Sequence, residues 1–310
     1  GTPGDGRTDH ISVTMNNPLY DHIAENLSSL EDAVPKVFVD QLKQKYGRSL
    51  YAIVFYGSCL RSRDYADAML DFYVIVNDYK TAYKNFLERV AIRCLPPNVY
   101  CLNAEYRDKQ YIAKYAVISQ HALQKAVSER ALHSYFWARF CQPIAHVYLA
   151  EPQAKDFLVA IQTNAVTTFI SKVAPLMGSS ITPQGLWVQG FEYTYAAELR
   201  AERKTRAQTI FEDNREFYLR IIDVCPAQPA KQSAQVARGV WQFRIVLGKL
   251  LSILRLLKAA TTFNNGADYI AWKIHRHTGE QLAVTPRLRK YPWLFAWPIL
   301  FKLIVKRTIK

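Results

Sequence analysis

Two short apolar runs in the first third of the chain, residues 50–56 and 70–76, stand out in the pattern of hydrophobic and polar positions. Both are rich in β-branched and aromatic residues, which predicts two buried strands. The first run ends in Gly57-Ser58, and Asp71 lies at the start of the second. The pattern therefore predicts a strand, a sharp turn and a second strand, with polar groups close to the turn.

The flanking pattern predicts a small mixed sheet with helices packed on it, in a chain of the α+β class. Helices are expected over 19–45 (one or two), 58–65, 79–92, 121–127 and 131–140, and further strands over 99–106, 111–118 and 143–149. The strand 111–118 is expected to return antiparallel to its predecessor after a polar turn. Ser119 is expected to cap the helix that follows.

From about residue 153 the pattern becomes mainly helical. Helices are expected over 157–173, around 187–222, over 235–259 and over 263–277, with the Pro-Ala-Gln-Pro sequence at 226–229 as a linker. The predicted organisation is an expression-tag remnant at 1–14 with Met15 as the native start, a domain at 15–150 that contains the mixed sheet, a mainly helical domain at 151–284 and a tail at 285–310.

The tail combines basic and aromatic residues, and no Asp or Glu follows Glu280. Trp, Phe and Leu beside Lys and Arg are typical of an amphipathic segment that lies in a membrane interface. The residues expected to associate with a membrane are Arg289, Lys290, Trp293, Phe295, Trp297, Phe301 and Lys302. The alternative is a terminal helix that docks on the protein itself. The apolar stretch is too short, and too interrupted by prolines, to span a bilayer.

Composition narrows the choice of partner and compartment. The chain has 310 residues, of which 50% are hydrophobic, so one large or two smaller domains can form a sizeable core. The net charge of +14 favours polyanions or anionic membrane surfaces as partners. Nucleic acid ranks below a membrane, because Leu, Ile and Phe dominate the end of the tail. The five cysteines form no CxxC pair, which indicates free thiols in a reducing compartment.

Gly57-Ser58 and Asp71 together predict a site for chemistry on a nucleoside triphosphate. A glycine permits a sharp turn whose backbone N–H groups face an anion, and a nearby carboxylate is suited to a metal ion. An acidic residue in a buried strand is costly unless a cation or hydrogen-bond donors satisfy it. The nucleotidyltransferase pattern has a second carboxylate two residues further on, where this chain has Tyr73.

A second metal ligand must therefore come from elsewhere. The candidates are Glu105, Asp67 and Asp78, of which we favour Glu105 because it ends the strand 99–106. Asn103, on the same face of that strand, is expected to hold a ribose or phosphate oxygen. Lys114 lies in the middle of the next strand, where it is expected either to bind a triphosphate or to form a salt bridge with Asp71 or Glu105. Asp71, Glu105 and Lys114 are thus the candidate catalytic residues.

The combination of Tyr56-Gly57-Ser58, the Ala-Met-Leu-Asp-Phe block at 68–72 and Val76-Asn77-Asp78 resembles the mitochondrial-type phosphatidate cytidylyltransferases, the translocator assembly and maintenance protein family. The similarity covers roughly 50–218 and is strong to about residue 147. The resemblance implies transfer of CMP from CTP to phosphatidic acid, giving CDP-diacylglycerol and pyrophosphate, with Mg²⁺ or Mn²⁺. It also implies a nucleotidyltransferase fold followed by a winged-helix-like helical domain and a membrane-associating C-terminal segment.

The resemblance also assigns residues. The nucleotide site is expected at Tyr56, Gly57, Ser58, Asn103, Lys114 and Arg200, and the metal site at Asp71 and Glu105. The chain departs from the family at Phe191-Glu192-Tyr193, where the family has Asp and Arg. Glu192 is expected to replace the acid, and Arg200 or Lys204 the base. A bacterial relative is expected, peripheral on the cytoplasmic face of the cell membrane, or on the matrix side of the inner membrane if the source is mitochondrial.

Two other functions compete with this hypothesis. In the first, the same enzyme class acts on another lipid phosphate or on a soluble acceptor. In the second, the chain is a non-enzymatic membrane- or RNA-binding module on a decayed nucleotidyltransferase scaffold. The position of Tyr73, in place of a carboxylate, is the best argument for the second.

Overall fold

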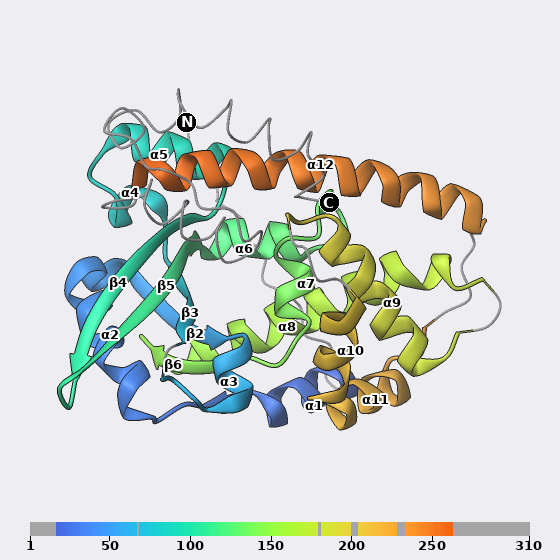
Figure 1. Ribbon diagram of the computed structural model, residues 1–310, viewed down its shortest axis with the longest axis horizontal. Coiled ribbons are helices and arrows are strands. Elements are labelled where there is room, and N and C mark those ends of the chain that lie inside the picture. The colour runs from blue at the N-terminus through green and yellow to red at the C-terminus, as the bar shows by residue number, and fades with distance from the viewer. Residues whose placement is uncertain (1–16, 67, 179–180, 200–203, 228–232, 263–310) are drawn as a thin grey trace, which may run out of the picture.

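A six-stranded mixed sheet forms the centre of the protein (Figure 1). The computed structural model describes residues 17–66, 68–178, 181–199, 204–227 and 233–262. The strands are β1 (Ser28–Ser29), β2 (Leu50–Tyr56), β3 (Met69–Val76), β4 (Asn98–Tyr106), β5 (Lys109–Ser119) and β6 (Ala145–Leu149). Their order is β1-β6-β2-β3-β5-β4. The pairs β1–β6 and β3–β5 are parallel and the other three are antiparallel.

Helices cover both faces of this sheet. They are α1 (Pro18–Asn26), α2 (Ala33–Tyr46), α3 (Ser58–Ser62), α4 (Tyr79–Ala82), α5 (Phe86–Cys94), α6 (Gln120–Val127), α7 (Trp137–Phe140), α8 (Gln153–Val173), α9 (Pro183–Ala196), α10 (Lys204–Glu212), α11 (Arg215–Val224) and α12 (Ala234–Thr262), with 3₁₀ turns at Gly47–Ser49 and Ala174–Leu176. The mixed α+β class expected from the sequence is confirmed.

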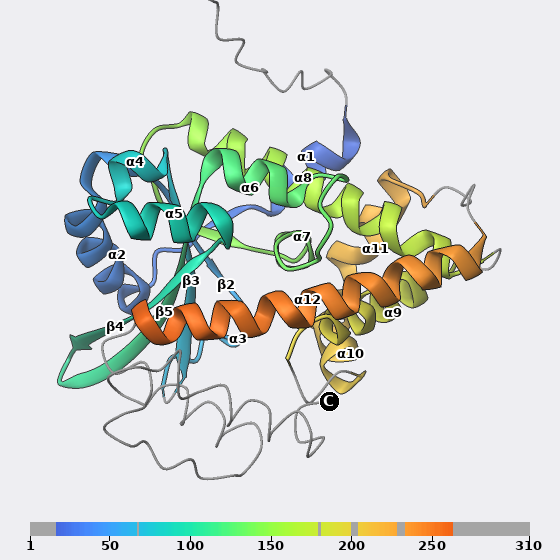
Figure 2. The ribbon, with the colours of Figure 1, turned by 90° about the horizontal axis from the view of Figure 1, so that it is seen from above.

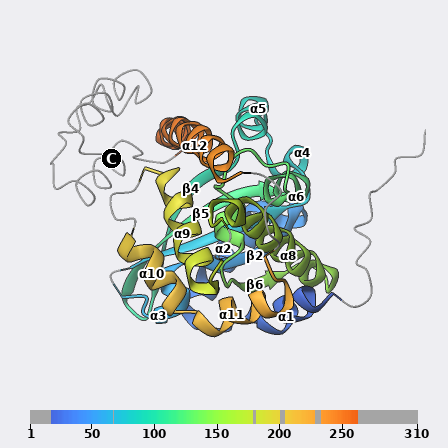
Figure 3. The ribbon, with the colours of Figure 1, turned by 90° about the vertical axis from the view of Figure 1, so that its right-hand side faces the viewer.

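Alternation along β3 sets the direction of the side chains. Leu70 and Phe72 belong to the core on the α2 side of the sheet, and Tyr73 and Ile75 belong to the core on the opposite side. Because side chains on a strand alternate between faces, Asp71 shares the face of Tyr73. That face is covered by α1, α6 and α7 together with the helices of the second half of the chain, as the end-on view shows (Figure 3).

The strand predictions are confirmed closely, and Ser119 caps α6 by accepting a hydrogen bond from the Ala122 N–H at 3.3 Å. The helix expected over 79–92 is interrupted, because Asn85 starts a new helix by accepting a hydrogen bond from the Leu87 N–H at 2.8 Å. The helix expected over 131–140 is wrong for its first six residues. The Leu132 carbonyl accepts a tertiary hydrogen bond from Arg244 of α12 at 3.0 Å, in place of a bond within a helix.

The hydrophobic core continues across the domain boundary expected at residue 150. One cluster of buried residues joins Val54 and Ile118 of the sheet to Val166 of α8, Phe191 of α9 and Trp241 of α12. Helix α8, extended to Leu176, is long and apolar enough to cross a membrane, but 72% of its apolar window is buried inside the protein. This burial is what a central core helix produces.

Helix α12 runs along one edge of the molecule, from the neighbourhood of α5 to that of α9 (Figures 1 and 2). Several expectations fall outside the described residues: the remnant at 1–14, Met15, Asp67, Arg200, the helix over 263–277 and every tail residue from Arg289 to Lys302. Of the linker expected at 226–229, the structure describes Pro226 and Ala227.

Candidate functional site

Four polar or aromatic positions form a row across the sheet. Tyr56 on β2 pairs with Asp71 on β3, Asp71 with Lys114 on β5, and Lys114 with Cys101 on β4. The Lys114 Nζ atom lies 2.7 Å from Oδ1 of Asp71, and the two side chains are 28% and 26% exposed. The salt bridge expected as one alternative for Lys114 is therefore present, and it balances the charge of Asp71.

Gly57 brings the backbone against the Asp71 carboxylate. It connects β2 to α3 with φ +90° and ψ −158°, a conformation that only glycine adopts readily. A Cβ atom placed on Gly57 would lie 3.3 Å from Oδ2 of Asp71. The backbone conformation of the turn thus favours glycine, and an added Cβ would also press on the carboxylate.

Substitution of Gly57 by alanine is expected to lower the free energy of unfolding by about 1–3 kcal/mol, because the backbone conformation becomes strained. It should also displace the Asp71 carboxylate. Urea unfolding measures the first effect. The matched control is Gly178→Ala, which also has positive φ (+65°) but has nothing within 4 Å of the added Cβ. An effect on turnover equal to that of Gly178→Ala would contradict the close-approach role.

A cavity of about 70 Å³ opens beside this turn. Its walls come from both halves of the chain: Tyr56, Gly57, Ser58, Arg61, Asp71, Ala138, Arg139, Gln142, Thr194, Tyr195, Glu198, Arg206 and Ile210. Three arginines and two carboxylates therefore face one small space. Such a set is suited to an anionic ligand, because the guanidinium groups offer fixed, permanently charged donors.

Arg139 and Glu198 form the most buried ion pair of this cavity. The two guanidinium nitrogens of Arg139 lie 2.7 and 2.9 Å from the two carboxylate oxygens of Glu198, and the side chains are 13% and 11% exposed. Burial acts to lower the pKa of Arg139, but the Glu198 carboxylate outweighs it and holds that pKa above its ordinary value. The Arg139 guanidinium therefore stays charged inside the protein.

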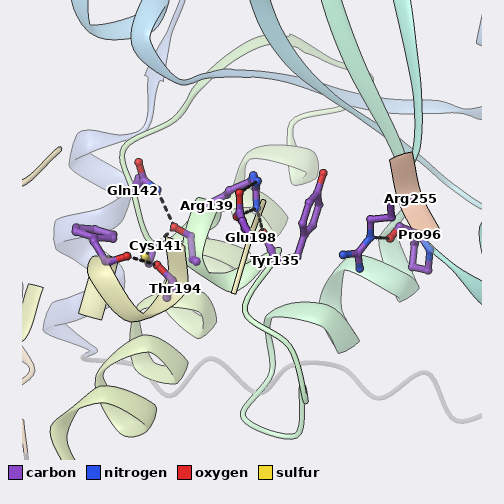
Figure 4. A network of polar contacts seen from close by, with 10 residues as sticks. Pro96, Tyr135, Arg139, Cys141, Gln142, Thr194, Glu198 and Arg255 are labelled. Carbon is purple, nitrogen blue, oxygen red and sulfur yellow. Dashed lines mark hydrogen bonds and ion pairs between the residues drawn. The ribbon is translucent and has the colours of Figure 1, made fainter. Parts of the chain in front are cut away.

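Tyr135 connects this pair to α12. Its ring lies 3.9 Å from the Arg139 guanidinium carbon and 4.2 Å from that of Arg255, so it lies against both cations (Figure 4). Arg255 also donates a hydrogen bond from Nε to the Pro96 carbonyl at 2.9 Å. A continuous series of contacts thus runs from the cavity to the last described helix.

His133 lies close to the two arginines of this network. Burial, with the positive charges of Arg255 and Arg139, lowers the pKa of His133 from 6.5 to about 4. The folded state thus prefers the neutral imidazole, whereas the unfolded state binds a proton below pH 6.5. Stability from this group is complete above pH 6.5 and is lost as the pH falls toward 4.

Between pH 7 and pH 4.5 the unmodified protein is therefore expected to lose about 2 kcal/mol more stability than the variant His133→Gln. Urea unfolding at the two pH values measures this difference. His121→Gln, at an exposed position of α6, is the control and should follow the unmodified protein. Equal acid sensitivity of the unmodified protein and His133→Gln would show that His133 is not held neutral.

Glu105 does not meet Asp71. Its carboxylate accepts a hydrogen bond from Gln110 at 2.7 Å, near the tip of the β4–β5 hairpin. Gln110 precedes Lys114 by four residues on β5, which places Glu105 about 13 Å along the sheet from the Asp71 row. The period-two count was right about the face of the sheet, but the register of the hairpin moves the carboxylate away.

The other predicted residues are placed as follows. Asn103 is exposed and pairs with Ile112, two residues along the strands from the row that contains Lys114. Asp78 caps α4 by accepting hydrogen bonds from the N–H groups of Lys80 and Thr81, which is the turn-forming role. Glu192 lies in α9 and is not a wall residue of the cavity, whereas Glu198 is.

Tyr73 belongs to the core rather than to the cavity wall. It is 1% exposed, its ring stacks on Tyr56 at 4.7 Å between centroids, and it contacts Phe140 at 4.9 Å. Burial, together with Tyr56 and Tyr135, raises the pKa of Tyr73, so its hydroxyl stays protonated. The position of the usual second carboxylate is therefore filled by an aromatic contact.

The predictions missed Arg139, Glu198, Arg61 and Arg206. One signal was available for the first: Arg139 is the only charge in Tyr-Phe-Trp-Ala-Arg-Phe at 135–140, and a charge in such a stretch requires a partner. Nothing local distinguishes the other three from solvated charges.

Asp71 fits a Mg²⁺ or Mn²⁺ ion of the kind that takes one protein carboxylate and completes its shell with substrate phosphates and water. Glu198 fits less well, because Arg139 occupies both of its oxygens. Within the described ranges, no three His, Cys, Asp or Glu side chains gather into a metal-binding group.

No model of a known protein family matches this chain, and neither does any curated protein sequence.

Proposed function

We propose that the protein is a nucleotidyltransferase of the phosphatidate cytidylyltransferase type, which transfers CMP from CTP to phosphatidic acid at a membrane surface. The observation that carries the proposal is the cavity that joins Gly57-Ser58 and Asp71 to Arg61, Arg139 and Arg206. A turn of backbone N–H groups, a carboxylate suited to a metal ion and several arginines are the equipment that phosphoryl chemistry requires.

In the proposed reaction, an oxygen of the lipid phosphate attacks the α-phosphorus of CTP. A new P–O bond forms, the bond to the bridging oxygen of the β-phosphate breaks, and pyrophosphate leaves with the electron pair. A phosphate monoester is already ionised at neutral pH, so the attack needs no strong general base. The cavity offers no free carboxylate as a base, since both of its described carboxylates have cationic partners, and the proposed reaction does not need one.

The residues of the cavity have separate roles in the proposed reaction. Arg61, Arg139 and Arg206 stabilise the negative charge of the phosphates, and Gly57 and Ser58 orient the departing end. A Mg²⁺ ion, when bound at Asp71, would stabilise charge on the α-phosphoryl group. Arg139 is held in place by Glu198, and Arg61 by Asp213 at 2.7 Å, so two of the three donors are fixed before any ligand binds.

The test is release of pyrophosphate from CTP by the full chain, with Mg²⁺ and vesicles that contain phosphatidic acid. ATP, GTP and UTP replace CTP in parallel reactions, and glycerol 3-phosphate replaces the lipid. Turnover that requires CTP and the lipid phosphate supports the proposal. Turnover with the soluble acceptor alone would support the alternative acceptor class instead. Absence of turnover with every pair, while the protein binds the vesicles, would refute an enzymatic function.

One observation favours the non-enzymatic alternative. Lys114 already neutralises Asp71, so this carboxylate has a complete ion pair without a metal. A binding module of this kind would hold anionic lipid with or without CTP, and the change Asp71→Asn would then leave every measurable property of binding unchanged. As an enzyme or as a module, the protein is proposed to lie on the cytoplasmic or matrix face of a membrane.

A further inference from the structure

Large exposed apolar side chains gather on two helices in the described part of the chain. Nine of them are 37–73% exposed: Phe86, Leu87 and Val90 of α5, and Val236, Val240, Phe243, Val246, Leu250 and Leu254 of α12. We call these nine residues the outer apolar surface. Exposed apolar side chains in such number are rarely left to water unless a partner covers them.

On α12 the exposed residues form a single stripe. They recur every three or four positions from Val236 to Leu254, which places them on one side of a helix over about 27 Å. The opposite side is fixed to the protein: Trp241 and Arg244 donate hydrogen bonds to backbone carbonyls, and a Cβ on Gly248 would lie 2.6 Å from the Ala197 carbonyl oxygen. The stripe is therefore the outward side of a helix that is already packed.

Helix α5 lies near one end of α12. Lys258 near the end of α12 donates hydrogen bonds to the carbonyls of Leu95 and Pro97, which follow α5 directly. Figures 1 and 3 place both helices at the same edge of the molecule. Phe86 and Leu87 are the most exposed large apolar residues of the described chain.

The charge of the chain is concentrated in the same part. Residues 224–310 contain fifteen Lys and Arg but only two acidic residues, Asp268 and Glu280, whereas 1–223 contain 25 basic and 24 acidic residues. Helix α12 itself has five basic residues and no acidic one. Almost the whole net charge of +14 therefore belongs to α12 and the sequence that follows it.

We propose that the outer apolar surface docks on an anionic lipid bilayer, with α12 lying along the membrane plane. The six stripe residues carry no hydrogen-bonding group, whereas protein interfaces are enriched in Tyr, Trp and Arg and form regular hydrogen bonds. Apolar side chains on one side of a basic helix are what an interfacial helix presents to acyl chains. This inference rests on the proposed function, because it identifies the surface by which the enzyme would bind its membrane. It is tested by vesicle binding, which is measured independently of turnover.

The test uses the full chain and two matched sets of serine substitutions on α12. The stripe variant is Phe243→Ser/Val246→Ser/Leu250→Ser, and the control is Gln235→Ser/Gln242→Ser, at exposed polar positions of the same helix. Co-sedimentation is measured with vesicles of phosphatidylcholine and phosphatidylglycerol in equal parts, and with phosphatidylcholine alone. The stripe variant is expected to bind the anionic vesicles about tenfold more weakly or worse, while the control binds as the unmodified protein does.

Three results would overturn the proposal. The first is equal vesicle binding by the stripe variant and the unmodified protein, and the second is an unmodified protein that binds neither vesicle. In the third, vesicle binding stays intact but the stripe variant shows another defect. Either the unmodified protein is a dimer and the variant a monomer, or the melting temperature of the variant falls to that of a chain that lacks residues 288–310. That result would assign the surface to a second copy or to the tail.

A single substitution guards against misfolding of the triple variant. Phe243→Trp keeps the apolar character, and brominated acyl chains are expected to quench its emission beyond the quenching of the unmodified protein, which already has six tryptophans. Gln242→Trp, one position away on the same helix, should be quenched much less. Equal quenching of the two indoles would show that the stripe does not face the lipid, whether or not the protein turns over CTP.

Discussion

Replacement of Asp71 by asparagine is expected to reduce pyrophosphate release by about a thousandfold, which corresponds to roughly 4 kcal/mol of transition-state stabilisation. The change removes the charge that is suited to a metal ion and leaves Lys114 without its partner at 2.7 Å. The side chain keeps its size, so the turn at Gly57 and the fold should be retained. Turnover is measured by the release of pyrophosphate, with vesicle binding and the melting temperature measured on the same preparation.

Glu105→Gln provides the matched control, since it makes the same chemical change on the same face of the sheet. Its carboxylate contacts Gln110 near the hairpin tip and not the cavity, so turnover should stay within about twofold of the unmodified protein. If Glu105→Gln lost most of its turnover while Asp71→Asn kept normal turnover, Glu105 and not Asp71 would be the catalytic carboxylate. That result would contradict the assignment that the register of β4 and β5 supports.

The second large effect is expected at the Arg139–Glu198 pair. Arg139→Met should lower the free energy of unfolding by about 3–5 kcal/mol, because it leaves the Glu198 carboxylate charged and almost buried. The double change Arg139→Met/Glu198→Gln should cost clearly less than the sum of the two single changes. Urea unfolding of the four proteins gives the coupling energy directly.

The Arg61–Asp213 pair serves as the comparison. It has the same nitrogen–oxygen distance, 2.7 Å, but Asp213 is 37% exposed. Water screens such a pair, so Arg61→Met should cost only about 1 kcal/mol of stability. Equal losses from Arg61→Met and Arg139→Met would mean that burial does not determine the strength of these contacts.

The sequence predicted those parts of the fold that depend on local pattern. The bounds of β2, the β4–β5 hairpin and the cap at Ser119 follow from apolar periodicity and turn chemistry, and the structure confirms them. The helix expected over 131–140 failed because a distant residue decided the local backbone. Arg244 of α12, more than a hundred positions later, holds the Leu132 carbonyl in place.

The candidate site divides in the same way. Gly57, Ser58 and Asp71 were found because one strand–turn–strand unit brings them together. Glu198, just after the end of α9, and Arg206 of α10 reach the same cavity, and no spacing in the sequence shows that these helices cover the Asp71 side of the sheet. Glu105 was chosen because of its strand and the face on which it lies. Its distance from Asp71 depends on the register of the hairpin, and a period-two count does not determine that register.

The hydrophobic core that the sheet shares with the later helices affects how the chain folds during synthesis. The sheet is complete once β6 has left the ribosome. The side of it that carries Val54, Tyr73 and Ile118 is then covered by α1, α6 and α7, but the helices from α8 onward that complete this core are still missing. A nascent chain that ends near residue 150 thus exposes part of an apolar core, which is prone to aggregate. Since Arg255 supports Tyr135 and thereby Arg139, the cavity is complete only after α12 has been translated. The first 150 residues alone thus leave this core incomplete, and chaperone binding during translation is expected at this sheet face.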